Sequence, residues 1–376
     1  MNFLEFRKAE FERRDLRLKH SRPMELVKTN EQKKRLHIVY VMTWVGVCGG
    51  SKIIMQHCNK LVERGHRATI VCHFPKPTWF PLSERVGFVH APFGEVLGEY
   101  IPRCDVIVAT YWKEIYECVE QKLAPVVYFE QGDSHLFEPE SYGVERMSHI
   151  KKQISLAPFV YTVSSFAAEK LKEIFNAEAE VIPNALDKTV FFADKDTEED
   201  KENKITITTI GSENIPFKCI YNIVIAVQIL IKLGYNIEFI WISPDSPSAL
   251  TTIPVKINLP QGEIGNCLRR SDIYICASLY ESFCLPVLEA MSCGAAVVTT
   301  DNGGIRDFVE DGNNAIVINK NNIADMVDKV AMLIDNPELR EKLIENARKT
   351  ACIFDWDSVA DRLLDYYKKI ASHEIL

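Results

Sequence analysis

Short apolar runs alternate with stretches of helical periodicity from Leu36 onward. The run LHIVYVM precedes a Gly-Gly pair, and the apolar residues of the next segment recur every three or four positions as far as Gly65. Apolar runs that predict further strands follow at 66–74, 106–110, 126–130 and 159–164. Because strands and helices alternate, the pattern predicts a parallel sheet covered by helices on both faces.

A second series of the same kind begins at residue 205. Its predicted strands occupy 205–211, 237–243, 272–278 and 295–300, and its predicted helices occupy about 221–234 and 286–292. Between the two series, residues 194–204 read DKDTEEDKENK and include no apolar side chain, which is typical of a linker or an exposed loop. We therefore expect two α/β domains in tandem, with a ligand bound beyond the carboxyl ends of the strands, in the cleft between the domains.

The first 35 residues differ from the rest of the chain. They contain 11 Lys and Arg against 6 Asp and Glu, a net charge of +5. Leu4, Phe11 and Leu18 recur every seven residues, which predicts a basic amphipathic helix. Two interpretations stay open. The helix packs on its own domain or on a dimer mate, or it lies on an anionic membrane surface.

Composition narrows the class of protein. The chain has 376 residues, of which 47% are hydrophobic and 26% charged, and its formal net charge is −8. These values exclude a disordered chain, a fibre and a small disulfide scaffold, and they argue against nucleic acid as a partner. No signal peptide and no apolar stretch of membrane-spanning length is visible, and the eleven cysteines include no C-x-x-C pair. We therefore expect a cytoplasmic protein with reduced thiols, at most peripheral to the inner membrane face.

The segment 278–315 carries the strongest chemical signal. Glu281 follows a predicted strand, Pro286 suits the first residue of a helix, and Glu289 then lies in the first helical turn. The backbone amides of residues 283–285 would point at a ligand with the positive end of the helix dipole behind them, which favours an anion. Two carboxylates beside such an anion are suited to accept hydrogen bonds from sugar hydroxyls rather than to bind phosphate.

This segment resembles the retaining glycosyltransferases that carry a Glu-x7-Glu signature on a GT-B fold, known as glycosyltransferase family 4 or glycosyl transferases group 1. The resemblance extends in the same order over roughly residues 36–370. It implies an α/β fold of two Rossmann-like domains that face each other across a cleft. It also implies that Glu281 contacts hydroxyls of the donor sugar and that Glu289 contacts the ribose of the nucleotide.

Other segments match the same family. The turn GGSKIIM places Gly49 and Gly50 where backbone amides approach the donor diphosphate, and Lys218 stands at the position of a cation on that diphosphate. The segment FDWDSVADRLLDYYKKI resembles the helix that crosses back onto the first domain. We expect a basic helical extension at 1–35, a first domain at 36–190 and a linker at 191–204. A second domain at 205–357 and a returning helix at 358–376 are expected to follow.

Three positions depart from the family pattern. Ser212 stands where an arginine is usual, and Cys219 and Cys284 replace glycines, the latter in the loop that touches the donor sugar. A lost arginine–phosphate contact costs about 1.5–3 kcal/mol if nothing replaces it, and Arg269 or Arg270 is a candidate replacement. Cys284 is expected to narrow the sugar pocket and to change the choice of donor.

The acceptor side is predicted from the polar loop that follows the strand at 126–130. In this loop Asp133 and His135 can orient an acceptor hydroxyl or the donor sugar, and Gln131 is a further candidate for the same role. No side chain is assigned as a general base.

Two Asp-x-Asp triplets, at 194–196 and 355–357, fit solvation or helix capping better than metal binding. Lys218 and helix-terminal amides can instead neutralise the leaving diphosphate. We therefore expect no obligatory metal and no cofactor other than the nucleotide-sugar co-substrate.

The predicted reaction moves a sugar from a nucleotide-diphosphate-sugar donor to a hydroxyl of a glycan, lipid-linked or protein acceptor, with the anomeric configuration retained. The catalytic candidates are Glu281, Lys218, Asp133 and His135. The donor-binding candidates are Gly49, Gly50, Ser212, Lys218, Glu281, Phe283, Cys284, Leu285 and Glu289. Two alternatives stay open. One is a non-catalytic GT-B protein that senses nucleotide sugars or assists another transferase, and the other is a GT-B epimerase or phosphorylase.

Overall fold

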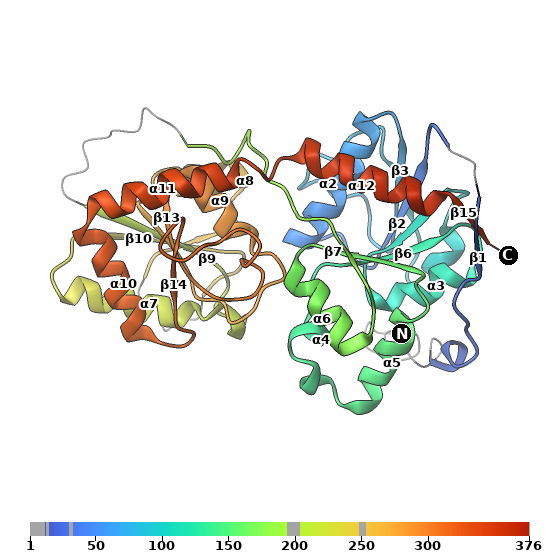
Figure 1. The fold of residues 1–376 in the computed structure, drawn as a ribbon, viewed down its shortest axis with the longest axis horizontal. Coiled ribbons are helices and arrows are strands. Elements are labelled where there is room, and N and C mark those ends of the chain that lie inside the picture. Colours follow the sequence, from blue (N-terminus) through green and yellow to red (C-terminus); the bar gives the residue numbers. More distant parts are fainter. Residues whose placement is uncertain (1–11, 13–14, 30–32, 194–203, 248–252, 376) are drawn as a thin grey trace. The chain divides into compact units, whose positions relative to one another are not determined.

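The computed structural model describes residues 12, 15–29, 33–193, 204–247 and 253–375. The chain divides into two compact units, which are shown in Figure 1 and described one at a time. The first unit comprises residues 1–183 with 357–376, and the second comprises residues 184–356.

The first unit is built on a seven-stranded parallel sheet with the order β4-β3-β2-β5-β6-β7-β8. Its strands are β2 (His37–Met42), β3 (Arg67–Cys72), β4 (Gly87–His90), β5 (Val106–Ala109), β6 (Val126–Glu130), β7 (Phe159–Thr162) and β8 (Glu180–Val181). Every residue of the central strands β2, β5 and β6 is buried, as expected for a parallel sheet covered on both faces. The carboxyl ends of these strands therefore share one edge of the sheet.

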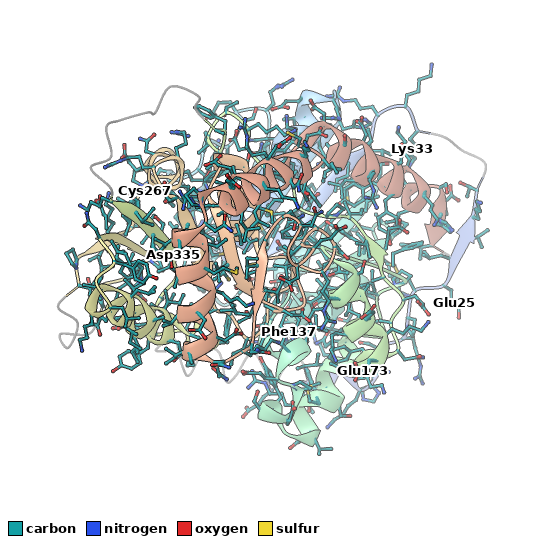
Figure 2. All side chains as sticks on the ribbon, turned by 60° about the vertical axis from the view of Figure 1, so that its left-hand side comes forward. Glu25, Lys33, Phe137, Glu173, Cys267 and Asp335 are labelled. Atoms are coloured by element: carbon teal, nitrogen blue, oxygen red, sulfur yellow. The ribbon has the colours of Figure 1, made fainter. Side chains whose placement is uncertain are left out.

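Helices connect these strands. They are α2 (Gly49–Glu63), η1 (Leu97–Tyr100), η2 (Trp112–Glu114), α3 (Ile115–Glu120), α4 (Ser134–Phe137), η3 (Pro139–Tyr142), α5 (Val144–Ile154) and α6 (Ser165–Phe175). Local sequence fixes the bounds of α6, because the Ser164 hydroxyl accepts a hydrogen bond from the Ala167 amide and Asn176 ends the helix in the left-handed conformation. Phe137, labelled in Figure 2, stacks on Phe166 and so joins α4 to α6.

The C-terminal helix α12 (Trp356–Ala371) contacts the end of α2 through its first turns. Arg64 Nε donates to Asp361 Oδ1 at 2.8 Å. The Tyr367 hydroxyl is 2.7 Å from that of Tyr40 and 2.9 Å from that of Tyr161, so a buried polar cluster fixes the helix to β2 and β7. The predicted helix over 358–376 is too long, because it ends at Ala371 and is followed by strand β15 (His373–Ile375).

The N-terminal stretch is not helical throughout. Residues 15–18 are helical, and Leu18 is buried in the core of the first unit, so this part packs on its own domain. Strand β1 (Leu26–Lys28) pairs antiparallel with β15, which corrects the expectation of a helix over residues 26–28. Leu4 and Phe11, which defined the predicted seven-residue repeat, lie outside the described residues.

The second unit contains a six-stranded parallel sheet with the order β11-β10-β9-β12-β13-β14. Its strands are β9 (Ile205–Ile210), β10 (Ile237–Ser243), β11 (Val255–Ile257), β12 (Ile273–Cys276), β13 (Ala296–Thr300) and β14 (Ile316–Ile318). Its helices are η4 (Pro216–Lys218), α7 (Ile220–Lys232), α8 (Gln261–Arg269), α9 (Leu285–Cys293), α10 (Ile323–Asp335) and α11 (Pro337–Ala351). Most of the charged run at 194–204 lies outside the described residues.

The fold expected from the sequence is confirmed. Each predicted strand is present, and the two sheets with their helices form two Rossmann-like units. Within the described ranges, none of the helices combines the length and apolar character that crossing a membrane would require.

Candidate functional site

Two loops of the second unit, after the neighbouring strands β9 and β12, are packed against each other. The amide of Leu279 donates to the carbonyl of Phe217 at 2.7 Å. The ring of Phe217 stacks on that of Tyr280 with centroids 4.4 Å apart. Because β9 and β12 are parallel neighbours, their carboxyl ends lie side by side, and these contacts bring Lys218 and Glu281 together.

Lys218 and Glu281 form a partly buried ion pair. The Lys218 Nζ lies 2.5 Å from Glu281 Oε1, and the two side chains are 20% and 15% exposed. Ser278 Oγ donates to the same carboxylate oxygen at 2.9 Å. Burial is the largest single effect and alone would lower the pKa of Lys218, but the charge and hydrogen bond of Glu281, together with the nearby Cys284 and Cys276, raise it. Lys218 is therefore an ammonium ion at neutral pH, held at the carboxyl edge of the sheet.

Helix α9 begins directly after this pair. Cys284 is its N-cap, in the left-handed conformation with φ 67°, and Leu285 and Pro286 are its first two residues. A Cβ on Gly304 would meet the amide nitrogen of Phe283 at 2.6 Å, so only glycine allows the loop after β13 to approach the start of α9. The first amides of a helix lack intrahelical acceptors, which makes this terminus suited to an anion.

Two predicted positions lie near this terminus. The ring of Phe283 is buried against Phe308 and Phe354, so its backbone amide, the group named in the prediction, is the part left for a ligand. The turn predicted for Glu289 needs correction. Glu289 is the fifth residue of α9 and lies in its second turn, not the first, where it is largely buried.

The position at which an arginine was expected is part of a polar cluster, in which Ser212 and Ser243 are buried and Asp245 reaches the surface. Ser212 Oγ donates to Asp245 Oδ2 at 2.8 Å, and Ser243 Oγ donates to Asp245 Oδ1 at 2.8 Å. The side-chain amide of Asn214 also donates to Asp245, and these hydrogen bonds lower the pKa of its carboxyl group. The sequence did not single out Asp245, which places a negative charge at this end of β10.

Arg269 and Arg270 do not replace the missing arginine. Both immediately precede β12 and so lie at the amino edge of the sheet, whereas Ser212 lies at the carboxyl edge. Arg269 is held by the carbonyl of Val190 at 2.8 Å and by the ring of Phe192. The expectation of compensation by these two side chains is therefore wrong.

The two cysteines that stand at family glycine positions both have positive φ angles, 49° for Cys219 and 67° for Cys284. A side chain in this region costs about 1–2 kcal/mol, which explains why glycine suits these turns. The Sγ atom of Cys284 lies 3.6 Å from that of Cys276, and both residues are buried. Cys284 thus points into the domain interior, which does not support the expected narrowing of a sugar pocket.

In the first unit, Gly49 and Gly50 begin α2 after the N-cap Cys48. A Cβ on Gly50 would lie 3.3 Å from Nε2 of Gln131, so the loop after β6 covers the start of this helix. A Cβ on Gly49 would meet nothing within 4 Å. Gly50 therefore has a local packing reason to be glycine, whereas Gly49 has none within this unit.

A buried ionic network follows β6. His135 Nε2 lies 2.9 Å from Glu130 Oε2, and the imidazole is fully buried. Glu130 also accepts hydrogen bonds from the hydroxyl of Tyr128 at 2.5 Å and from the amide of Gly132 at 2.6 Å. Burial alone would lower the pKa of His135, but Glu130 and Asp133 together raise it to about 9. Glu130, which the sequence did not single out, thus fixes the loop that carries Asp133.

Asp133 is the more accessible member of this loop, with a side chain 39% exposed. Its carboxylate accepts hydrogen bonds from the Ser134 amide at 2.8 Å and from the Tyr111 hydroxyl at 2.9 Å. Burial would raise the pKa of Asp133, but these bonds and the neighbouring His135 hold it well below its usual range. Asp133 is therefore an ionised hydrogen-bond acceptor, oriented by its neighbours.

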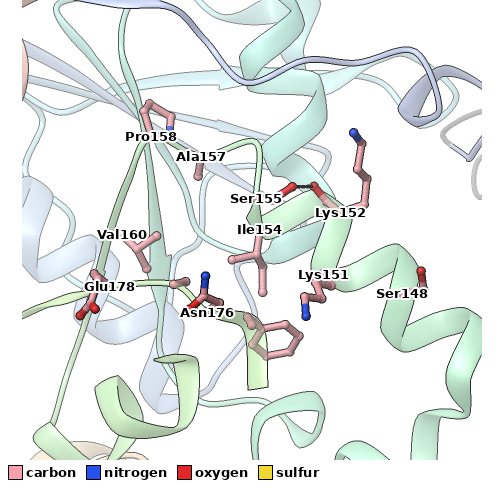
Figure 3. A pocket seen from close by; sticks show the side chains of 12 residues that line it. Ser148, Lys151, Lys152, Ile154, Ser155, Ala157, Pro158, Val160, Asn176 and Glu178 are labelled. Atoms are coloured by element: carbon pink, nitrogen blue, oxygen red, sulfur yellow. Dashed lines mark hydrogen bonds between the residues drawn. The ribbon is translucent and has the colours of Figure 1, made fainter. Parts of the chain in front are cut away.

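A hollow of about 700 Å³ on the first unit lies elsewhere (Figure 3). It is lined by the end of α5, the residues that precede β7 and the end of α6, including Lys151, Lys152 and Glu178. It thus lies at the amino edge of the sheet, opposite the loop of Asp133. Over the described residues, no group of three or more His, Cys, Asp or Glu side chains is arranged to hold a metal ion.

The second unit matches a known family. Residues 252–350 match the family model described as "Glycosyl transferases group 1". The chain is 26% identical over 246 residues to the MMP alpha-(1->4)-mannosyltransferase of Mycolicibacterium hassiacum, covering 61% of this chain and 57% of the relative. It is 35% identical over 108 residues to the D-inositol 3-phosphate glycosyltransferase of Thermomonospora curvata, covering 29% and 25%. The matches thus span little more than half of one relative and a quarter of the other.

Solved structures extend the likeness to both units. The sucrose-phosphate synthase of Thermosynechococcus elongatus superposes with a TM-score of 0.75 at 14% identity, over 89% of this chain and 99% of that chain. HepE of Anabaena, solved with UDP-glucose, gives a TM-score of 0.71 at 15% identity, over 88% and 99%. At such identities the likeness is one of fold. The chain therefore has the GT-B fold, and its residues 252–350, which carry Glu281 and Glu289, match the family model of the glycosyl transferases group 1.

Proposed function

We propose that the chain is a retaining glycosyltransferase that moves a sugar from a nucleotide-diphosphate-sugar donor to an acceptor hydroxyl. The observation that carries this proposal is the Lys218–Glu281 pair, which lies at the carboxyl ends of β9 and β12 and directly before α9. A cation, a carboxylate that accepts hydrogen bonds and the N-terminus of a helix thus lie next to one another. A nucleotide sugar presents the matching groups, a diphosphate beside sugar hydroxyls.

The leaving diphosphate is stabilised by Lys218 and by the N-terminus of α9. An ammonium group has three donors, so its bond to Glu281 leaves others for phosphate oxygens. The raised pKa of Lys218 keeps it charged throughout the neutral range. Stabilising a departing diphosphate with groups already in position is an effective way to lower the barrier, and it needs no metal ion.

Glu281 accepts hydrogen bonds from hydroxyls of the donor sugar, and Glu289 from the ribose. Glu281 is held for this role by Ser278 and by its own amide, which donates to the carbonyl of Asn302 at 2.9 Å. Retention of the anomeric configuration is proposed from the Glu-x7-Glu spacing of these two residues.

The first unit binds the acceptor. Asp133, ionised and accessible, accepts a hydrogen bond from a sugar hydroxyl, and the buried His135 acts as a positioning residue through Glu130. We propose a glycan or glycoconjugate hydroxyl as the acceptor. Relatives differ here, because one is named for D-inositol 3-phosphate and another for a diphospho-undecaprenol-linked sugar.

Substitution of Glu281→Gln tests the proposal. The variant keeps the shape of the side chain but loses its charge, and we expect the rate of sugar transfer to fall about a hundredfold or more. The purified chain is first screened by thermal shift against UDP, GDP, dTDP and ADP, since a ligand that binds the folded state raises its melting temperature. Transfer from the matching nucleotide sugar is then followed by nucleotide release, and the anomeric configuration of the product by NMR.

Glu341→Gln, on the exposed face of α11, is the matched control and should keep full activity. Full activity in Glu281→Gln would contradict the central assignment. Binding of nucleotide without any transfer, across a panel of glycan acceptors, would instead favour a non-catalytic nucleotide-sugar binder. Activity that disappears with EDTA would refute the metal-independent part of the proposal.

A further inference from the structure

We propose that Cys276 and Cys284 form a reversible disulfide that weakens the nucleotide-sugar site of the second unit when the chain meets a peroxide. The two Sγ atoms lie 3.6 Å apart, in van der Waals contact. A disulfide has a sulfur–sulfur distance of about 2.05 Å, so the bond needs an approach of about 1.5 Å. Cys276 is the last residue of β12 and Cys284 is the N-cap of α9, so the bond would close the loop that carries Glu281.

The surroundings of Cys276 favour its reaction as a thiolate. Its sulfur lies 3.5 Å from Ser278 Oγ and 4.0 Å from the side-chain amide of Asn302, in addition to the thiol of Cys284. The hydrogen bond from Cys284 lowers the pKa of Cys276 against the opposing effects of burial and of the Glu281 charge, and Lys218 and the backbone of Ser278 make smaller contributions in the same direction. The thiolate is the reactive form of cysteine, so Cys276 is the attacking group and Cys284 the resolving one.

The reaction balances with hydrogen peroxide as the oxidant. The Cys276 thiolate attacks one peroxide oxygen, the O–O bond breaks, and hydroxide leaves and takes up the proton released by the thiol. The Cys284 sulfur then attacks the sulfenic sulfur, the S–S bond forms, and the S–O bond breaks to release water with the Cys284 proton. Overall two thiols and one peroxide give one disulfide and two waters, and the two sulfurs lose the two electrons that the peroxide oxygens gain.

The loop between the two cysteines is also the donor-binding loop of the proposed function. It contains Ser278, which contacts both Cys276 and Glu281, so the sulfur and the carboxylate share one hydrogen-bonding neighbour. Binding sites depend on positions held within about 0.5 Å, and closure of the disulfide moves its two ends by more than that. We therefore expect nucleoside diphosphate affinity to fall at least tenfold on oxidation and to return with dithiothreitol.

Peptide mapping of the full-length chain tests the disulfide without reference to function. Cleavage after Lys and Arg and after Glu places Cys276, Cys284 and Cys293 on peptides 271–281, 282–289 and 290–306. After treatment with hydrogen peroxide and blocking of free thiols, we expect the first two peptides to be linked and to separate on reduction. Linkage of Cys276 to Cys219, or oxidation of Cys276 to a sulfinic acid without any linkage, would overturn the proposal.

Nucleotide binding to the same samples tests the consequence. Cys284→Ser and Cys276→Ser should each bind nucleotide with the same affinity before and after peroxide treatment, whatever that affinity is, whereas Cys293→Ser, buried at the end of α9, should lose affinity on treatment as the unmodified chain does. If the two peptides are linked but the treated chain binds nucleotide with unchanged affinity, the idea that the disulfide controls the nucleotide-sugar site is refuted.

The inference rests on the proposed function only for this consequence. Linkage in a chain that binds no nucleotide when reduced would refute the proposed function and leave the disulfide standing. Nucleotide binding by the reduced chain, with no linkage after peroxide, would refute the disulfide and leave the proposed function standing.

Discussion

Raising the pH from 6.5 to 9.5 is expected to destabilise the first unit through the buried imidazole of His135. Burial by itself would lower the pKa of His135, but Glu130 and Asp133 raise it to about 9, against about 6.5 in an unfolded chain. Because the folded pKa is the higher one, the stabilisation is fully present below pH 6.5 and is lost as the pH rises through 9. The difference corresponds to about 3 kcal/mol, at about 1.4 kcal/mol per pH unit.

Urea unfolding at several pH values, compared between the unmodified chain and His135→Gln, isolates this contribution. Glutamine still donates to Glu130 but does not titrate. The unfolding free energy of the unmodified chain minus that of His135→Gln should therefore fall by about 3 kcal/mol between pH 6.5 and 9.5. His37, His57 and His66, whose pKa values are lowered by burial, titrate near pH 6.5 in the unfolded chain, but both proteins contain them, so their contribution cancels in the comparison. A difference that stays constant, or an NMR titration that gives His135 a pKa below 7, would refute the reasoning.

Three further predictions follow from the second unit. Lys218→Ala should weaken nucleoside diphosphate binding by about 1.5–3 kcal/mol, or roughly 10- to 150-fold by calorimetry, whereas Lys232→Ala at the far end of α7 should not. Gly304→Ala should destabilise the unit by about 1–3 kcal/mol and weaken the same binding, because its Cβ would collide with backbone. Gly262→Ala, whose Cβ would meet nothing within 4 Å, should change neither property. Cys219→Gly should raise the unfolding free energy by about 0.5–1 kcal/mol in urea, and a decrease would contradict the idea of a strained turn.

The sequence was sufficient to predict the central strands but not the edges of the sheets. Strands such as β2, β9 and β13 have five or six residues rich in β-branched side chains, and their burial on both faces leaves a clear pattern. Strands β4, β8, β11 and β14 have only two to four residues, and at the edges of the sheets they pair on one side alone. Their pairing is set by the neighbouring strand, so their own residues carried no signal.

The same contrast applies to the candidate site. The proximity of Lys218 and Glu281 could be expected, because both follow strands of one parallel sheet and their spacing matches a family pattern. The contacts of Asp245 could not, because Ser212 and Asn214 come from a different segment. Those of Cys276 and Glu130 are made largely within one segment, but they depend on how the loops after β12 and β6 turn back, which periodicity does not show. Only the register of β9 with β10 and β12 shows which polar groups meet at the carboxyl edge.

The cluster around Asp245 changes what an arginine at position 212 would do. Asp245 is held ionised at the ends of β9 and β10, so an arginine introduced alone would pair with this carboxylate rather than with a diphosphate. Ser212→Arg should therefore leave nucleoside diphosphate affinity nearly unchanged, whereas Ser212→Arg with Asp245→Ala should raise it about tenfold or more, as a charged hydrogen bond to phosphate does. Calorimetry with both variants separates the two cases. An equal gain in the single variant would show that Asp245 does not set the charge of this edge.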